Sequence, residues 1–291
     1  MDLQFTKMHG LGNDFIVVDC ADAARSDAVK ARAKFLCDRR RGVGADGVIC
    51  VLPAEAAGAD FRMRIFNADG SEAEMCGNGA RCFGEYLRVT GRGCVTNTLV
   101  IDTLAGLIEA EFTHADDAGG HYRVNMGPPR LSPNDIPVIP VEISDSDFIM
   151  KEVTVLDRTF RVTAMSMGNP HAVVYADELS DELVLTYGPA IQKHSFFPKS
   201  VNVEFVKIVS PDRIRMRVYE RGCGETHACG TGACAAVVSG ILNKMHGNDV
   251  TVNLTGGNLR ITWDGDITQP VYKSGPARVV FTGAIEEGGA V

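Results

Sequence analysis

Short runs rich in Val, Ile, Phe and Thr, often alternating with polar positions, recur along the whole chain and predict many short strands. The predicted strands are Ile16–Val18, Val48–Leu52, Asp60–Phe66, Thr98–Thr103, Leu107–Phe112, His121–Asn125, Glu152–Leu156, Arg158–Ala164, Ala172–Tyr175, Val201–Val209, Ile214–Tyr219, Val250–Leu254, Asn258–Trp263 and Ala277–Phe281. Helical patterns are fewer: Asp22–Asp38, Ala80–Val89, Leu179–His194 and Ala233–Leu242. The helices are too few for winding of βαβ units, so the pattern favours an α+β fold.

One strand-to-helix pattern occurs twice, 153 residues apart, and aligns without a gap. In each copy a strand is followed by a glutamate and then by a cysteine in a Cys-Gly-x-Gly-Ala sequence that opens a helix. The matched pairs are Arg62–Phe66 with Arg215–Tyr219, Glu72 with Glu225, and Cys76 with Cys229. The period is much longer than that of a solenoid repeat, so the repeated unit is a whole domain.

The domain boundary falls in the most proline-dense stretch, 126–137. We therefore expect one domain at 1–127, with Cys76, and a second at 128–276, with Cys229. The last segment, 277–291, is expected to pack back on the first domain. Each domain is predicted to be a mostly antiparallel sheet or barrel wrapped round one central helix that begins at its cysteine.

Composition narrows the function classes. The chain has 291 residues, 45% of them hydrophobic, a net charge of −8 and no long basic block, so neither nucleic acid nor an anionic membrane is an expected partner. The N-terminus lacks the apolar segment of a signal peptide, which favours the cytoplasm. The nine cysteines include no Cys-x2-Cys pair, which argues against a zinc ribbon or a thioredoxin-type site. Several are expected to be packing residues: Cys20, Cys37, Cys50, Cys82, Cys94 and Cys234.

Cys76 and Cys229 differ from these because each stands where a helix begins. Unpaired backbone N–H groups and the positive end of the helix dipole favour a thiolate there, and they can also hold a carboxylate. Two such thiols in related domains suit proton removal from one face of a carbon and proton delivery to the other, in a cleft between the domains. The alternative without a function is a pair of buried thiols at glycine turns, which the duplication disfavours.

The motifs of the chain, in order, resemble those of the diaminopimelate epimerase family over nearly the whole length. They are Met8–Phe15 (MHGLGNDF), Gly42–Asp46, Phe66–Glu72, Met75–Cys82 (MCGNGARC), Gly168–His171, Val201–Val203, Glu220–Arg221 and Ala228–Ala233 (ACGTGA). The resemblance implies a cofactor-independent, metal-free isomerase that interconverts LL- and meso-2,6-diaminopimelate in lysine and peptidoglycan biosynthesis. It also implies two similar domains. A homodimer is expected from the family and because homodimers are the commonest oligomers.

Roles follow residue by residue from this resemblance. Cys76 and Cys229 match the catalytic thiols, and His171 and Glu220 match residues that assist them. The matches to substrate-binding residues are Asn13, Asn67, Gly77, Asn78, Asn169, Asn202, Glu220, Arg221, Gly230 and Thr231. The chain departs from some members at Gly47, where they carry Gln, so that a substrate contact is absent or is made by backbone. His227 is given no role.

Two rival functions stay open at this level. A proline or hydroxyproline racemase would use the same cysteine pair, although residues for a distal amino acid end would then have no purpose. A thiol redox sensor or metal-binding protein would use the two reactive thiols differently. For Glu220–Arg221 the alternative is a surface ion pair that contributes little to stability. For His171 the alternative is a buried histidine whose ring nitrogens are hydrogen-bonded but have no catalytic role.

Overall fold

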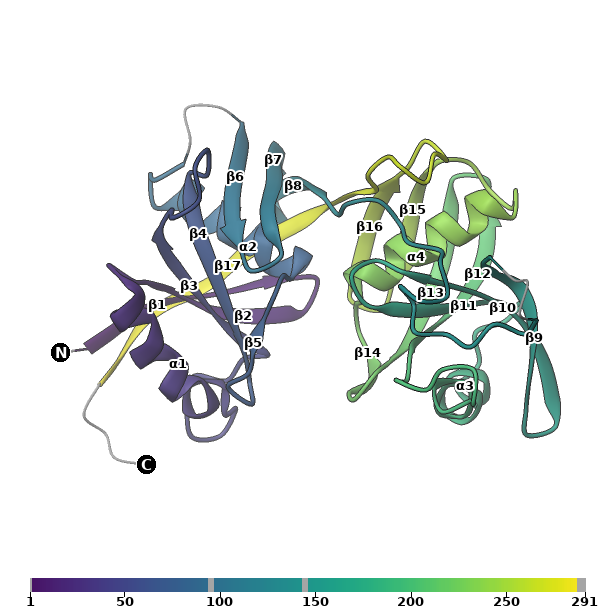
Figure 1. Cartoon of the computed structure of the whole chain (residues 1–291). Coiled ribbons are helices and arrows are strands. Elements are labelled where there is room, and N and C mark those ends of the chain that lie inside the picture. The colour runs from purple at the N-terminus through teal and green to yellow at the C-terminus, as the bar shows by residue number, and fades with distance from the viewer. Residues whose placement is uncertain (1, 94–96, 143–145, 287–291) are drawn as a thin grey trace. The chain divides into compact units, whose positions relative to one another are not determined.

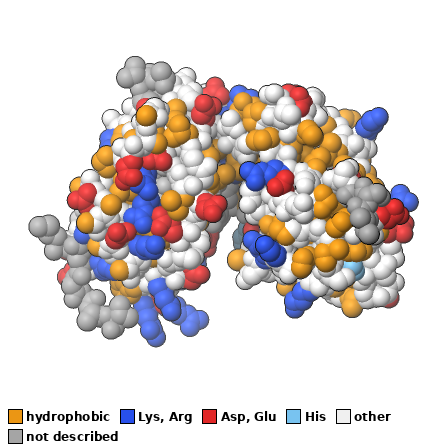
Figure 2. All heavy atoms as spheres, in the orientation of Figure 1, with side chains coloured by type: hydrophobic (Ala, Val, Ile, Leu, Met, Phe, Trp, Pro, Cys, Tyr) orange, Lys and Arg blue, Asp and Glu red, His pale blue; other side chains and the backbone are white. Residues whose placement is uncertain are grey.

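The computed structural model describes residues 2–93, 97–142 and 146–286. The chain forms two compact units, Met1–Asn125 with Ser274–Val291, and Met126–Lys273 (Figure 1). The expected boundary at 127/128 lies close to the end of the first segment of unit 1 at Asn125. The expected return at 277 lies close to Ser274, where the chain re-enters unit 1. On the face that Figure 2 shows, basic and acidic side chains lie side by side in several places. Within the described part of the chain, no helix combines the length and the apolar character needed to cross a membrane.

Eight strands close a barrel in the first unit. Strand pairing runs β1–β2–β3–β4–β6–β7–β8–β17 and returns to β1. The strands are β1 (Asp2–Gly10), β2 (Asn13–Asp19), β3 (Gly47–Pro53), β4 (Phe61–Asn67), β6 (Thr98–Thr103), β7 (Gly106–Asp116), β8 (Gly119–Asn125) and β17 (Tyr272–Glu286). Helix α2 (Gly77–Val89) packs against six of these strands and is buried over nearly its whole length, whereas α1 (Ala23–Cys37) packs against β3 and β4.

The second unit repeats this plan. Pairing runs β9–β10–β11–β12–β13–β15–β16, and the apolar helix α4 (Gly230–Leu242) packs against six of these strands, β10 to β13, β15 and β16. The strands are β9 (Phe148–Val155), β10 (Arg158–Ser166), β11 (Pro170–Tyr175), β12 (Asn202–Ser210), β13 (Arg213–Glu220), β15 (Asp249–Leu254) and β16 (Gly257–Thr262). A π-helical turn, η1 (Leu183–Tyr187), continues into α3 (Gly188–Gln192).

Parallel pairs occur at matching places in the two units. β2 is parallel to β3 and β11 to β12, while β4 is parallel to β6 and β13 to β15. The second pair in each unit is joined through the central helix, α2 or α4. The two units therefore share topology as well as sequence, and the prediction of duplicated α+β domains round central helices is confirmed.

A bidentate ion pair recurs in the hairpin before each cysteine. Arg64 donates Nε and Nη2 to the two carboxylate oxygens of Glu72, at 2.7 and 2.9 Å. Arg217 does the same to Glu225, at 2.7 and 3.0 Å. Each pair ties a short return strand, β5 (Glu72–Ala73) or β14 (Gly224–Thr226), to the strand that approaches the cysteine.

The local structure differs from the predictions in three places. The segment before Asn13 is itself a strand, β1, and the strand predicted at Ala277–Phe281 is the middle of the longer β17. Both central helices begin at their cysteines, as predicted, although the helical patterns in the sequence start only at Ala80 and Ala233, because the Cys-Gly-x-Gly openings have poor intrinsic helix propensity and are held by tertiary packing. The short strands β5 and β14 were not predicted at all. The packing prediction for Cys94 lies outside the described residues, whereas the other five packing cysteines are buried.

Candidate active site

Cys76 is the N-cap residue of α2 in the first unit. Its backbone is extended, with φ −142°, and its sulfur accepts a hydrogen bond from the backbone N–H of Gly79 at 3.4 Å. The hairpin β4–β5 delivers the cysteine to this position, and Gly79 lies so close to Ile65 that a Cβ would come within 2.9 Å of the Ile65 side chain. The thiol is therefore fixed at the open N-terminal turn of a helix that has free N–H groups.

Asn13 faces this thiol from the start of β2. Its Oδ1 lies 3.9 Å from the Cys76 sulfur and accepts a hydrogen bond from Asn78 Nδ2 at 3.1 Å. Asn78 Oδ1 in turn accepts from the fully buried guanidinium of Arg81 at 3.0 Å. Three predicted site residues, Asn13, Cys76 and Asn78, thus form one hydrogen-bonded cluster.

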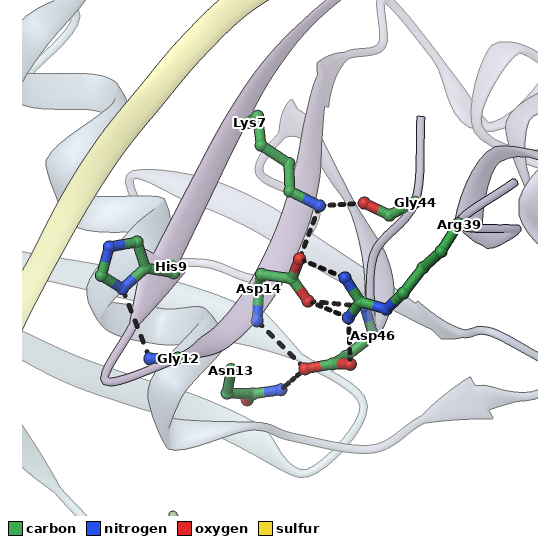
Figure 3. Close-up of polar contacts among 8 residues, drawn as sticks. All are labelled: Lys7, His9, Gly12, Asn13, Asp14, Arg39, Gly44 and Asp46. Atoms are coloured by element: carbon green, nitrogen blue, oxygen red, sulfur yellow. Dashed lines mark hydrogen bonds and ion pairs between the residues drawn. The ribbon is translucent and has the colours of Figure 1, made fainter. Parts of the chain in front are cut away.

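The orientation of Asn13 is set by a network of charges on its other side (Figure 3). Asp46 accepts from Asn13 Nδ2 at 2.9 Å and from the backbone N–H of Asp14 at 3.1 Å. Arg39 bridges both carboxylates, and Lys7 pairs with Asp14 at 2.7 Å. Because Asp46 binds the amide nitrogen of Asn13, the amide oxygen is left to face Cys76 and Asn78.

Asp14 is ionised over most of the pH range. Burial alone would raise its pKa, but hydrogen bonds from Arg39 and Lys7, together with their charges, outweigh burial and lower the pKa of Asp14 to about 2. The Asp14 carboxylate therefore stays charged at neutral pH, together with Arg39, which also binds the Asp46 carboxylate that orients Asn13.

Cys229 is the N-cap residue of α4 in the second unit and repeats the geometry of Cys76. The backbone N–H of Gly232 donates to its sulfur at 3.4 Å, and Thr231 Oγ1 lies 3.5 Å from it. Burial raises the pKa of the Cys229 thiol well above its ordinary value, and nearby Glu220 and Glu204 raise it further. The helix terminus and the hydrogen bonds from Thr231 and Gly232 favour the thiolate, but desolvation and the two carboxylates outweigh them in this state, so Cys229 favours the thiol.

The strand ends of the second unit supply the remaining polar groups. Asn202 donates to the carbonyl of Pro170 at 3.0 Å and accepts from the backbone N–H of Arg221 at 2.8 Å. Glu220 accepts a short hydrogen bond from the hydroxyl of Thr226. The Arg221 side chain is exposed and donates to the carbonyl of Lys199 at 3.3 Å.

His171 is fully buried and bonded on both ring nitrogens. Nδ1 lies 2.7 Å from Glu204 Oε1, and Nε2 lies 2.9 Å from Asn169 Oδ1. The sequence analysis did not identify Glu204, although a signal was available, since Glu204 is an acidic residue within the apolar run Val201–Val206. Asp46, which orients Asn13, ends the motif Gly42–Asp46 but was given no role.

Two further positions from the sequence analysis are Asn67 and Gly47. Asn67 is exposed, and its side chain donates to Ser71 Oγ at 2.9 Å within the β4–β5 turn. A Cβ on Gly47 would come within 2.8 Å of the Phe66 carbonyl oxygen, so a side chain at this position requires the backbone to shift. Gly77 and Asn78 open α2, and Gly230 and Thr231 open α4, so their backbone N–H groups lie in the first turns of the two helices.

Comparisons with known proteins agree with this geometry. The sequence model described as diaminopimelate epimerase matches residues 5–132 and 163–280. The chain is 47% identical over 287 residues to the diaminopimelate epimerase of Halothermothrix orenii, covering 98% of each chain. It is 48% identical over 288 residues to that of Desulforudis audaxviator, covering 97% of this chain and 98% of the relative.

Solved structures of lower identity share the fold. A hydroxyproline epimerase from Agrobacterium vitis has a TM-score of 0.69 at 16% identity and covers 98% of this chain and 91% of its own. A probable proline racemase from Agrobacterium radiobacter has a TM-score of 0.70 at 16% identity, with coverage of 98% and 93%. From the sequence match and the two cysteine-capped helices together, the chain belongs to the diaminopimelate epimerase family.

Proposed function

We propose that this chain epimerises LL-2,6-diaminopimelate to the meso isomer, with Cys76 and Cys229 as its two acid–base groups. The observation that carries the proposal is the pair of cysteine N-caps at duplicated positions, in a chain 47–48% identical to diaminopimelate epimerases. One sulfur, as thiolate, takes the α-proton, and the other, as thiol, delivers a proton to the opposite face. In the reverse reaction the two sulfurs exchange roles.

The α-carbon is a weak acid, so the negative charge that develops on the reacting carboxylate must be stabilised. The backbone N–H groups of Gly77, Asn78, Gly230 and Thr231 are suited to this, since they lie at the first turns of α2 and α4. Thiolate formation at Cys229 requires that its raised pKa fall when substrate binds. The helix terminus and the hydrogen bonds from Thr231 and Gly232 act in that direction.

Specificity for a substrate with two amino acid ends is assigned to polar side chains near the cysteines. Arg221 can bind the distal carboxylate through its planar fork, and Glu220 can pair with an ammonium group. Asn13, Asn67, Asn169 and Asn202 are proposed to bind the remaining polar groups. We also propose that the enzyme acts in the cytoplasm, where its thiols stay reduced, and as a homodimer.

The test is an NMR assay of the purified, reduced protein in D2O without added cofactor. LL-diaminopimelate and L-proline are offered separately, and we expect loss of the α-proton signal and formation of the other isomer only with diaminopimelate. Exchange with proline alone would assign the chain to the racemases instead. Exchange with neither substrate would leave the redox and metal-binding alternatives.

The same assay on Cys76→Ser and Cys229→Ser tests the roles of the thiols. We expect turnover to fall by several orders of magnitude, because a serine hydroxyl is a much poorer base. Serine is a good N-cap residue, so thermal unfolding should change little or shift upward. Near-full turnover in either variant would contradict the two-base mechanism, and Cys223→Ser, an exposed thiol outside the helices, is the control.

A further inference from the structure

A buried acidic side chain, Glu204, lies behind His171 on the neighbouring strand. β11 and β12 are parallel, with His171 opposite Asn202 and Val173 opposite Glu204. Asn202 and Glu204 are two residues apart on one strand, so both face the same side of the sheet as His171. Both members of the pair are fully buried, with 2.7 Å between Nδ1 and Oε1.

Glu204 also lies against the first turn of the helix that carries Cys229. A Cβ on Gly232 would lie 2.6 Å from Glu204 Oε1 and 3.2 Å from the Cys229 sulfur. Glycine at position 232 therefore leaves room for the carboxylate on one side and the thiol on the other. A residue that served packing alone would not need an acidic group at this place.

The carboxylate is incompletely satisfied. Oε2 of Glu204 is buried and has no hydrogen-bond partner among the described residues. Burial raises the pKa of Glu204, while the charge and hydrogen bond of His171 lower it. An acidic group in such surroundings costs free energy unless a partner shares its proton or charge, and His171 is positioned to do so.

The contacts of the imidazole ring indicate where its protons lie. Nδ1 faces Glu204 Oε1 and Nε2 faces Asn169 Oδ1, so both contacts are satisfied when each nitrogen carries a proton. When Glu204 is ionised it can only accept, so the proton of this hydrogen bond lies on Nδ1, and Nε2 is the nitrogen on the side of Asn169.

We infer that Glu204 is a positioning residue for the epimerisation: it fixes the His171 ring through Nδ1, so that Nε2 faces Asn169, one of the proposed substrate-binding residues. The consequence for catalysis rests on the proposed function. The other titratable groups near the pair are Glu220, whose charge acts on both Glu204 and Cys229, and the Cys229 thiol itself. Glu204 therefore links the protonation of His171 to the site of Cys229.

A double-mutant cycle with His171→Gln tests the inference through activity. Glu204→Gln has nearly the same size and keeps the space beside Gly232 filled, but its neutral amide can either accept from or donate to Nδ1, so it neither selects one tautomer nor stabilises a protonated ring by charge. We expect kcat to fall about ten- to a hundredfold with KM changed less than about threefold, and the alkaline limb of the pH profile to move to lower pH. In the His171→Gln background the same change should cost less than about twofold.

Glu85→Gln is the matched control for burial. Glu85 is a buried acidic residue on α2 that pairs with Arg88 and accepts from Tyr122, near the helix end remote from Cys76. Its replacement should lower stability without moving the pH profile. Equal losses of kcat for Glu204→Gln in the wild-type and His171→Gln backgrounds would overturn the inference.

The ¹⁵N NMR spectrum of labelled histidine gives a readout that needs no turnover, with His171 assigned by its absence from the His171→Gln spectrum. In the wild-type protein at neutral pH the ¹⁵N shifts should show that Nδ1, the nitrogen facing Glu204, carries a proton. In Glu204→Gln this preference for a protonated Nδ1 should be lost. A wild-type Nδ1 without a proton overturns the inference, even if Glu204→Gln does not fold. Failure of the enzyme to turn over diaminopimelate would instead refute the proposed function and leave this spectrum interpretable.

Discussion

Cysteine is a poor choice for a helix N-cap, and both central helices of this protein have one. Ser, Thr, Asp or Asn in that position stabilises a helix by about 1 kcal/mol relative to residues that cannot cap. The sulfurs of Cys76 and Cys229 accept from the backbone only at 3.4 Å in each case. The chain thus gives up capping strength at two sites, which is expected where reactivity and not stability determines the residue.

Asp14 provides a pH-dependent contribution to stability at the residue scale. Its pKa is lowered in the folded protein, so the stabilisation is fully present above about pH 4 and is lost as the pH falls towards 2. The shift from 3.8 to about 2 corresponds to about 2 kcal/mol. We predict that Asp14→Asn lowers the free energy of unfolding at neutral pH by an amount of this order, measured by urea denaturation.

The acid limb distinguishes this effect from general damage. Wild-type stability should fall between about pH 4 and about pH 2 more steeply than that of Asp14→Asn, because the variant has no carboxyl to protonate there. Asp266→Asn, an exposed acidic residue bonded within its own turn to Thr268, is the control and should have a much smaller effect. Equal slopes for wild type and Asp14→Asn would contradict the assignment.

At the scale of elements, the duplicated arginine–glutamate pairs hold the hairpins that lead to the two cysteines. Both pairs are bidentate and partly buried, with side-chain exposures of 13% and 15% for Arg64 and Glu72. Such geometry retains more energy than an ordinary surface ion pair. The return strands β5 and β14 are short, so the ion pairs replace the ladder hydrogen bonds that longer strands would supply.

We predict that Glu72→Gln and Glu225→Gln each lower the free energy of unfolding by about 1–2 kcal/mol and also reduce kcat, because each loosens the hairpin before a cysteine. Chemical denaturation and the diaminopimelate assay measure the two effects. Asp249→Asn is the matched control, since it also removes a bidentate arginine pair, but Arg260 and Asp249 are 65% and 50% exposed. If the glutamate variants behave like this control, the hairpin pairs do not position the cysteines.

At the scale of the whole molecule, each unit holds one cysteine-capped helix, and the proposed chemistry needs both. We predict that a mild oxidant such as diamide inactivates the enzyme by forming a Cys76–Cys229 disulfide, in which two thiols lose two protons and two electrons to the oxidant. Peptide mapping should find this link, and reductant should restore activity. Cys223→Ser should oxidise in the same way, because the exposed Cys223 is not involved. An oxidised, inactive sample without the 76–229 link would contradict the prediction.

Much of the site could be identified in the sequence because its motifs are local. Cys76-Gly-Asn-Gly and Cys229-Gly-Thr-Gly are contiguous, and the structure places Asn13, which the sequence analysis matched to a substrate-binding residue, beside Cys76. Glu204 could have been found as a charge in an apolar strand, but its partner could not, because His171 lies 33 residues away along the chain. Likewise, nothing local relates Asp46 to Asn13.

The sequence by itself determined the duplication, the strand-rich fold and the two cysteine-capped helices, because these follow from periodicity, turn residues and short motifs that neighbouring positions set. Only the tertiary structure decided which polar groups meet and which protons they hold. The orientation of Asn13, the His171–Glu204 pair and the raised pKa of Cys229 all depend on burial and on charges brought together from separate strands. Desolvation and electrostatics act through space, so sequence proximity does not determine them.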